Sequence, residues 1–193
     1  MKRIIIMAVA ALMATTTLNA QTAGDIKFRA RGGGNLSTLT GTDDAKDKIG
    51  WTIGFGLDYC FTDQFALCLD VSRDQLGCKS KSLDKKLNLE YLSLGPMVKY
   101  YSIPWIAVQA GLEIGFLRKA KMDGVNYKDA YKKTEFSLPI GLSFEPKISK
   151  KDVALVIDLR CHLGLSNANE KDALVEDVKN KAFILTLGYK FGL

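Results

Sequence analysis

The chain has 193 residues, of which 25% are charged and 47% hydrophobic, with 27 Lys and Arg against 21 Asp and Glu. This length predicts one domain, or two small ones. A mean hydropathy of +0.01 excludes a polytopic helical membrane protein, because each spanning helix needs about 20 consecutive apolar residues. It leaves a membrane β-barrel open, since barrel strands alternate apolar and polar side chains and average to near-neutral hydropathy.

The N-terminus has the three parts of a secretory signal peptide. Lys2 and Arg3 precede an apolar stretch from Ile4 to Ala14, and small or polar residues lead to an expected cleavage after Ala20. A membrane anchor is the alternative, but the apolar stretch is too short to span comfortably. We therefore expect residues 1–20 to be a signal peptide and residues 21–193 to be the mature domain. Export and a mild positive charge argue against nucleic-acid binding.

The four cysteines, Cys60, Cys68, Cys78 and Cys161, enter an oxidising compartment if the chain is exported. Their spacing matches no zinc pattern, and we expect neither a metal nor a cofactor. Four cysteines permit three pairings, and the sequence does not choose among them. A cross-strand bridge between Cys60 and Cys68 is one option, and small side chains that fill a tight interior are the other.

Large apolar residues occupy every second position from Trp51 to Phe61, with Thr, Gly, Asp and Cys between them. This alternation predicts a β-strand. The same pattern recurs in six further segments, at residues 65–72, 92–100, 106–116, 136–145, 153–165 and 183–191. A weaker first strand over residues 27–35 makes eight, an even number that is typical of closed antiparallel outer-membrane barrels.

Short and long connections alternate along the chain. Residues 62–64, 102–104 and 147–151 form brief turns, whereas residues 36–49, 74–88, 118–134 and 166–181 form long loops. Outer-membrane barrels keep short turns on the periplasmic rim and longer loops outside. The sequence therefore predicts an eight-stranded antiparallel up-and-down transmembrane β-barrel with both chain ends in the periplasm.

A soluble, ligand-carrying barrel of the lipocalin type is the alternative architecture. Its apolar residues would face inward, but eight strands enclose an interior only just wide enough for side chains to fill. The bulky apolar set would leave no room for a ligand, and the exterior would be rich in glycine. The membrane barrel, with bulky residues toward lipid and small or charged residues in the lumen, is favoured. Aromatic residues near the strand ends are expected to form interfacial girdles: Trp51, Tyr59, Phe61, Tyr100, Tyr101, Trp105, Phe144, Tyr189 and Phe191.

Charged residues of both signs are expected on the lumen face. The set comprises Arg29, Arg31, Asp58, Asp70, Glu113, Asp158, Arg160 and His162, together with Lys99, Gln109, Glu145 and Lys190. Unpaired buried charges are costly, so we expect these groups to pair and to close the lumen as a polar plug. A gated ion path is the functional alternative, although the bore of eight strands is too narrow for an open channel.

His162 is the single histidine, and it follows Asp158 and Arg160 on one strand face. A histidine near an aspartate is a candidate general base, but no nucleophile accompanies it, so we expect a member of the polar network. The sequence contains no P-loop, HExxH or GxSxG motif. The glycines at 32–34 are expected to relieve crowding or to shape the first strand.

Two of the long loops are basic. The candidate anion-contact residues are Lys79, Lys81, Lys85 and Lys86 in the second loop and Arg118, Lys119 and Lys121 in the third. Contact with the phosphates of lipopolysaccharide is the functional hypothesis, because lysine offers a point charge to anions. A solvated charged surface is the plainer interpretation.

Several segments are similar to one known family. They are the Gly34-Asn35-Leu36-Ser37-Thr38-Leu39 stretch, KIGWTIGFGLDY at 48–59, EYLSLGPMVKYY at 90–101 and LGYKFGL at 187–193. Over essentially the whole mature length the chain resembles the PorT-like outer-membrane β-barrel domain proteins of Gram-negative bacteria. The resemblance implies an integral outer-membrane protein without enzymatic activity, and the namesake of the group is tied to protein secretion.

The residues and the resemblance together suggest a non-enzymatic outer-membrane barrel with a structural or interaction role at the cell surface. A narrow pore, or a subunit of a secretion or transport machinery, is the second hypothesis. An enzyme acting on lipid or peptide is the third. Expected partners are outer-membrane lipid, including lipopolysaccharide, and the barrel-insertion machinery during biogenesis.

Overall fold

The computed structural model describes residues 22–41, 45–80, 85–128, 131–149, 152–166 and 178–193. The signal peptide expected at residues 1–20 lies outside these residues. Almost all of the described chain is β-strand, and within it no helix is long and apolar enough to cross a membrane.

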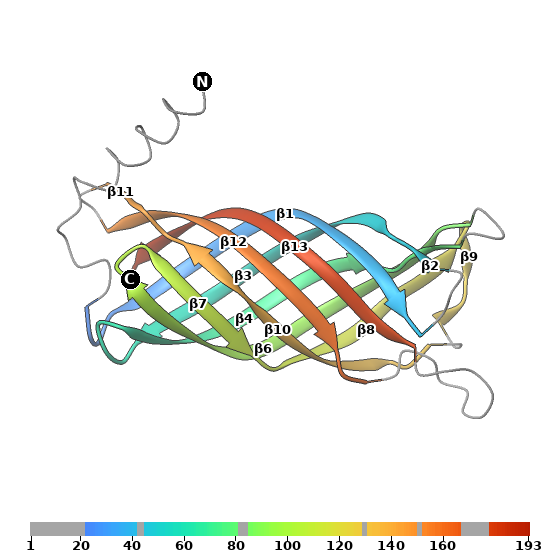
Figure 1. The fold of residues 1–193 in the computed structure, drawn as a ribbon, viewed down its shortest axis with the longest axis horizontal. Coiled ribbons are helices and arrows are strands. Elements are labelled where there is room, and N and C mark those ends of the chain that lie inside the picture. The colour runs from blue at the N-terminus through green and yellow to red at the C-terminus, as the bar shows by residue number, and fades with distance from the viewer. Residues whose placement is uncertain (1–21, 42–44, 81–84, 129–130, 150–151, 167–177) are drawn as a thin grey trace, which may run out of the picture.

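Eight antiparallel strands close into a barrel (Figure 1). The barrel strands are β1 (Ile26–Thr40), β3 (Lys48–Cys60), β4 (Phe65–Leu76), β6 (Leu87–Ile103), β7 (Ile106–Gly111) continued by β8 (Glu113–Met122), β10 (Thr134–Phe144), β12 (Val153–Gly164) and β13 (Lys179–Gly192). Each pairs with its neighbours in the chain, and β1 pairs with β13 to close the sheet. The predicted architecture is therefore confirmed.

Short strands extend this framework at both ends: β2 (Ala45–Lys46), β5 (Lys79–Ser80), β9 (Val125–Asn126) and β11 (Lys147–Ser149). The end that carries the brief turns and the C-terminus is called the turn end here, and the opposite end, which carries the long connections, the loop end (Figure 1).

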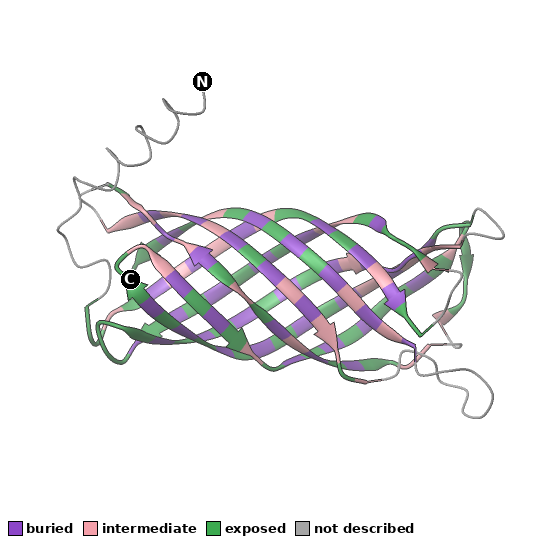
Figure 2. Cartoon of the chain, viewed as in Figure 1, coloured by how far each residue is buried: buried purple, intermediate pink, exposed green. Residues whose placement is uncertain are grey.

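Side chains alternate between lipid face and lumen along every barrel strand (Figure 2). On β3, Phe55 and Leu57 are exposed, at 53% and 44%, whereas Asp58 is fully buried. Bulky apolar residues cover the outside because lipid, rather than a protein core, surrounds the strands. This orientation excludes the soluble barrel, in which the same residues would be buried.

The strands continue well into the segments expected to be loops. β1 runs to Thr40, β6 begins at Leu87 and β13 begins at Lys179. The predicted boundaries at 36–49, 74–88, 118–134 and 166–181 are therefore wrong at these ends. The reason is that the alternating pattern reverses near the loop end: Leu89 and Tyr91 of β6 point inward, whereas Leu92 and Leu94 of the same strand point outward.

Aromatic rings gather at the turn end, as an interfacial girdle requires. Phe28 contacts Phe191 with ring centroids 5.3 Å apart, and Phe65 contacts Tyr100 at 4.9 Å. Tyr101 was assigned to this girdle wrongly, because it has the inward parity of Lys99 and is only 2% exposed.

Candidate functional site in the barrel lumen

The lumen-facing charges expected from the sequence all lie on the inner wall of the barrel. Arg29, Arg31, Asp58, Asp70, Glu113, Asp158, Arg160 and His162 are buried, as are Lys99, Gln109, Glu145 and Lys190. Because side chains alternate between the two faces of a strand, these residues lie on one face of the sheet. Closure of the sheet into a barrel then brings side chains from distant strands within contact distance. They form two interlocked clusters and a third group nearer the loop end.

The arginine cluster, defined as Arg29, Arg31, Arg160, Asp70 and Asp158, occupies the middle of the lumen. Asp70 accepts hydrogen bonds from Arg29 at 2.7 Å, Arg160 at 2.6 Å and Arg31 at 3.2 Å. Asp158 accepts from Arg29 at 3.3 Å and Arg160 at 3.0 Å. Three guanidinium groups are thus held by two carboxylates contributed by strands β4 and β12.

The lysine cluster, defined as Lys99, Lys190, Asp58, Glu145 and Tyr101, lies next to it toward the turn end. Lys99 donates to Glu145 at 2.5 Å and to Asp58 at 3.2 Å. Lys190 donates to Glu145 and to the Tyr101 hydroxyl, which itself donates to Glu145 at 2.9 Å. Asp58 connects the two clusters, because it also lies 3.3 Å from a nitrogen of Arg29.

A glycine makes room for this arrangement. A Cβ atom at Gly56 would lie 2.5 Å from Asp70 Oδ1 and 2.8 Å from a terminal nitrogen of Arg29. These distances are shorter than van der Waals contact, and both side chains are fully packed. Gly56 on β3 therefore belongs to the site although it carries no functional group.

The third group, nearer the loop end, is rich in carboxylates. His162 Nδ1 lies 3.8 Å from Glu113 Oε1, and the Asn180 amide donates to Glu135 at 2.9 Å. Asp74 accepts a hydrogen bond from Ser72 at 2.5 Å. A cavity of about 10 Å³, lined by Arg31, Ser72, Asp74, Glu113, Arg160 and His162, separates this group from the arginine cluster. That volume holds about one water molecule.

The first two clusters together carry one positive charge in excess. The first two clusters contain five cations, Arg29, Arg31, Lys99, Arg160 and Lys190, and four carboxylates, Asp58, Asp70, Glu145 and Asp158. Arg31 carries the additional positive charge, and its Nε and Nη1 atoms have no hydrogen-bond partner among the residues that the structure describes. Asp74 and Glu113 line the same small cavity as Arg31.

An apolar cluster lies inside the barrel at the loop end. This mouth cluster consists of buried residues from β1, β4, β6, β8 and β13 and the adjoining turns, namely Leu39, Leu76, Cys78, Leu87, Leu89, Tyr91, Leu117, Ala120, Val178, Ala182 and Ile184. This cluster is not predicted from the sequence, because most of its residues lie in or beside the segments expected to be loops. The signal in the sequence is that apolar residues still occupy every second position, as Leu87, Leu89 and Tyr91 do, but on the inward instead of the outward face of the strand.

The candidate anion-contact residues lie on the outer face of the loop end. Lys85, Lys86, Arg118, Lys119 and Lys121 are exposed, Lys79 is half-buried, and Lys81 lies outside the described residues. Lys119 is partly engaged, 3.6 Å from Glu90.

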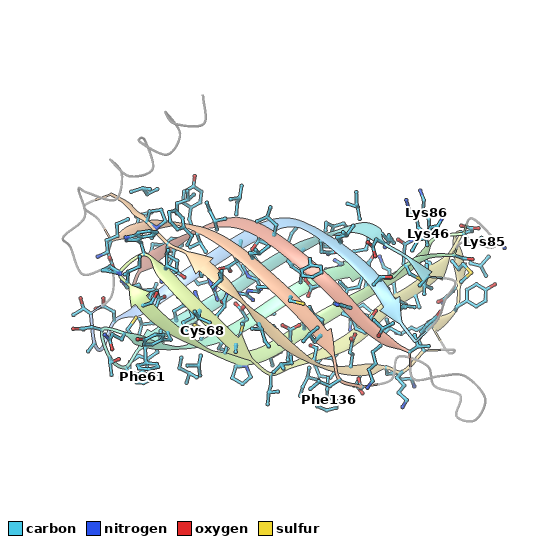
Figure 3. All side chains as sticks on the ribbon, in the orientation of Figure 1. Lys46, Phe61, Cys68, Lys85, Lys86 and Phe136 are labelled. Atoms are coloured by element: carbon cyan, nitrogen blue, oxygen red, sulfur yellow. The ribbon has the colours of Figure 1, made fainter. Side chains whose placement is uncertain are left out.

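A lysine ladder lies at the tip of the loop end. Lys46 of β2 faces Lys79 of β5, and Lys79 forms a bridge with Lys86. Figure 3 labels Lys46, Lys85 and Lys86 together at this end. Lys46 was not among the expected residues, because only the pairing of two short strands reveals it. Like charges directly opposite one another in a ladder are destabilising, so this pairing concentrates positive charge at the tip of the loop end.

The two cysteines considered for a cross-strand bridge are not joined. Cys60 faces Ala66 and Cys68 faces Asp58 in the β3–β4 ladder, and no disulfide links them. Both lie in a small apolar cluster at the turn end of the lumen with Ala66, Met97, Tyr101 and Ala107. Their position matches the interpretation as small side chains in a tight interior.

Comparisons with known proteins agree with the barrel architecture. The description of the outer membrane protein β-barrel domain matches residues 7–191. OprG from Pseudomonas aeruginosa superposes with a TM-score of 0.56 at 13% identity, over 91% of this chain and 99% of OprG. Neisserial surface protein A gives 0.54 at 11% identity, over 87% and 97% of the two chains.

The attachment invasion locus protein Ail of Yersinia pestis has a TM-score of 0.52 and 16% identity, over 87% of this chain and 99% of Ail. No protein of curated function matches the chain in sequence. At these identities the solved structures establish the fold alone, whereas the family match covers nearly the whole chain and places it in the outer membrane. The chain belongs to the outer membrane protein β-barrel domain family.

Proposed function

We propose that this protein is a non-enzymatic outer-membrane barrel that does not conduct ions and acts as a structural or interaction protein at the cell surface. In this proposal residues 1–20 are removed on export and the loop end faces the exterior. The motifs at 34–39 and 90–101 support membership of the PorT-like group within the family.

The observation that carries the proposal is the filling of the lumen by buried side chains at two levels. The arginine and lysine clusters fill the middle with direct ion pairs, and the space beside them holds about 10 Å³. An ion that crossed this layer would have to displace paired charges from Asp70 or Glu145. The mouth cluster adds an apolar layer, in which a permeating ion would lose its hydration without compensation.

Planar-bilayer recording tests directly whether this lumen conducts ions. The folded protein, verified by its heat-modifiable gel migration, is expected to give no steady current at protein amounts that give clear steps with a general porin. A steady current from folded protein would contradict the proposal. It would favour the alternative, a narrow pore or a subunit of a secretion or transport machinery.

The loop end is the proposed interaction surface, and the lysine ladder of Lys46, Lys79 and Lys86 is its best-defined part. Within the described residues no carboxylate lies at ion-pair distance from these lysines, and their repulsion is relieved by an anionic partner. The phosphates of surface lipopolysaccharide fit this chemistry.

Binding of purified lipopolysaccharide to the folded protein in detergent tests this surface. The triple variant K46Q/K79Q/K86Q is expected to bind about tenfold more weakly at low salt. The matched variant K128Q/K132Q/K133Q, which removes the same charge from the β8–β10 connection, should keep most of the affinity. Equal losses in the two variants would show a diffuse charge effect and would overturn the role of the ladder.

A further inference from the structure

A shallow apolar groove of about 360 Å³ lies on the outer wall of the barrel, across β12, β13, β1 and β3. This β1 groove is lined mainly by Gly34, Leu36, Ile49, Leu159, Phe183 and Leu185. Its volume lies at the lower end of the range of small-molecule sites. Because the wall faces lipid, its natural occupant is part of a membrane lipid.

Gly34, the last residue of the glycine tract at 32–34, forms part of the floor of the groove for a reason unrelated to barrel packing. A Cβ atom at Gly33, which faces the lumen, would lie 2.1 Å from a backbone oxygen of Leu185, so glycine is required there. A Cβ atom at Gly34 would meet nothing closer than 3.7 Å, and one at Gly32 nothing closer than 3.8 Å. The barrel tolerates side chains at Gly32 and Gly34, and their absence only hollows the lipid-facing wall.

Two outward-facing aromatic rings flank this floor, and each carries a cation on the loop-end side. Phe183 of β13 lies beneath Lys181, with Nζ 5.9 Å from the ring centroid. Trp51, which pairs with Gly34 in the β1–β3 ladder, lies beneath the Arg73 guanidinium at 5.6 Å.

Lys181 is the more available of these two cations. Arg73 is already paired with Glu90 at 2.7 Å, whereas no carboxylate of the described chain lies within ion-pair distance of Lys181. The groove is therefore apolar along its length and positive at its loop-end rim, which matches an acyl chain joined to an anionic headgroup.

We propose that the β1 groove binds one acyl chain of the phosphorylated lipid anchor of lipopolysaccharide, with a headgroup phosphate bound by Lys181. The inference rests on the outward-facing loop end of the proposed function, because that orientation brings Lys181 to the outer leaflet. A second barrel is a poorer fit, since its convex wall would leave the hollow at Gly34 unfilled.

Native mass spectrometry of the full mature chain, reconstituted in nanodiscs and released into detergent, tests the groove. The probes are diphosphorylated hexa-acyl lipid A and the same lipid without phosphates. The wild type is expected to retain one diphosphorylated molecule and about tenfold less of the dephosphorylated one.

Gly34→Leu fills the groove, and Lys181→Gln removes the phosphate contact, so each is expected to reduce retention about tenfold. Ala110→Leu is the matched control, because Ala110 is exposed on β7, on the far side of the barrel from β1. This variant should retain lipid A as the wild type does. If Gly34→Leu lacks heat-modifiable migration and is therefore not folded, Gly34→Ala and Lys181→Gln take its place as the test. Each of these two variants is expected to retain several-fold less lipid A than the wild type.

Three outcomes would overturn the inference. The first is equal retention of lipid A by the wild type and the groove variants. The second is equal retention of the lipid with and without phosphates. The third is a dimer of the wild type that dissociates in the Gly34→Leu variant. The last would identify a second copy of the chain as the occupant. Failure of the closed-lumen proposal would be seen separately, as ion current through the folded wild type.

Discussion

Asp70→Asn is the sharpest test of the lumen network. The carboxylate of Asp70 lies within 3.2 Å of three arginines, Arg29, Arg31 and Arg160. The substitution preserves the shape of the side chain and removes its charge. Arg29 and Arg160 keep contacts with Asp158, but among the described residues Arg31 loses its only carboxylate within salt-bridge distance.

Removal of one partner from a buried ion pair typically costs about 3–5 kcal/mol. We expect Asp70→Asn to lower the free energy of unfolding by about that amount, measured by urea titration in lipid vesicles with the fluorescence of Trp51 and Trp105 as the signal. Asp47→Asn, which removes the same charge from an exposed position, should change it by less than about 0.5 kcal/mol. A loss below about 1 kcal/mol for Asp70→Asn would refute a network held together by charge.

The double variant Asp70→Asn with Arg31→Gln separates charge balance from lost hydrogen bonds. In the described part of the chain, two nitrogens of Arg31 lack a hydrogen-bond partner, so its removal takes away the cation that Asp70→Asn isolates. We expect the double variant to be more stable than the sum of the single effects predicts, by about 1–3 kcal/mol. Strict additivity would show that Arg31 and Asp70 act independently.

Three further predictions concern the wall, the lysine cluster and the turn end. Gly33→Ala places a Cβ atom 2.1 Å from a backbone oxygen of β13. It should lower the free energy of unfolding by about 3 kcal/mol in the same titration. The neighbouring Gly34→Ala is the control and should change the free energy of unfolding by less than about 0.5 kcal/mol. Tyr101→Phe removes a buried hydroxyl that both donates and accepts, and should cost about 2 kcal/mol; no change would show that water replaces it. Burial raises the pKa of Asp152. The hydrogen bond from Lys147 and the positive charge of Lys27 outweigh the effect of burial, and they hold the pKa of Asp152 below its usual range. Its contribution, below about 1 kcal/mol at a partly exposed site, is present above about pH 4 and is lost as the pH falls through the lowered pKa, so Asp152→Asn should flatten that part of the stability profile.

The strand order and the direction of most side chains could be predicted from the sequence because the repeating unit is local. Alternation of Trp51, Ile53 and Phe55 with Thr52 and Gly54 determines which face meets lipid. The same alternation along β6 also predicts that Tyr101, two residues after Lys99, faces the lumen. Tyr101 lies near a strand end, where aromatic residues of a girdle are found, but its inward orientation keeps it out of the girdle.

The partners within the lumen could not be predicted, because they depend on register and closure. Asp70 and Arg160 are 90 residues apart in sequence and lie on strands that are not hydrogen-bonded neighbours. Their contact exists only because the barrel is narrow enough for side chains to cross it. The lysine ladder escaped prediction for a related reason, since the pairing of Lys46 with Lys79 joins two-residue strands without an alternating pattern.

The reversal of the apolar pattern locates the loop-end boundary of the membrane. The outward side chains change from apolar to polar between Val71 and Arg73 on β4, and between Phe183 and Lys181 on β13. From Phe183 to Phe191 the strand rises about 26 Å, which at a tilt of about 40° spans about 20 Å of membrane, close to the apolar band of an outer-membrane barrel.

Beyond this boundary the strands continue into water, where lipid no longer covers an apolar outer face. There a sheet is stable only if it buries apolar side chains on its inner face. The mouth cluster supplies that core, since Leu76, Leu87 and Leu89 turn inward as Arg73 and Glu90 turn outward. The apolar cluster inside the loop end is therefore a consequence of extending the barrel past the membrane, and the charged clusters occupy the part of the lumen that the membrane surrounds.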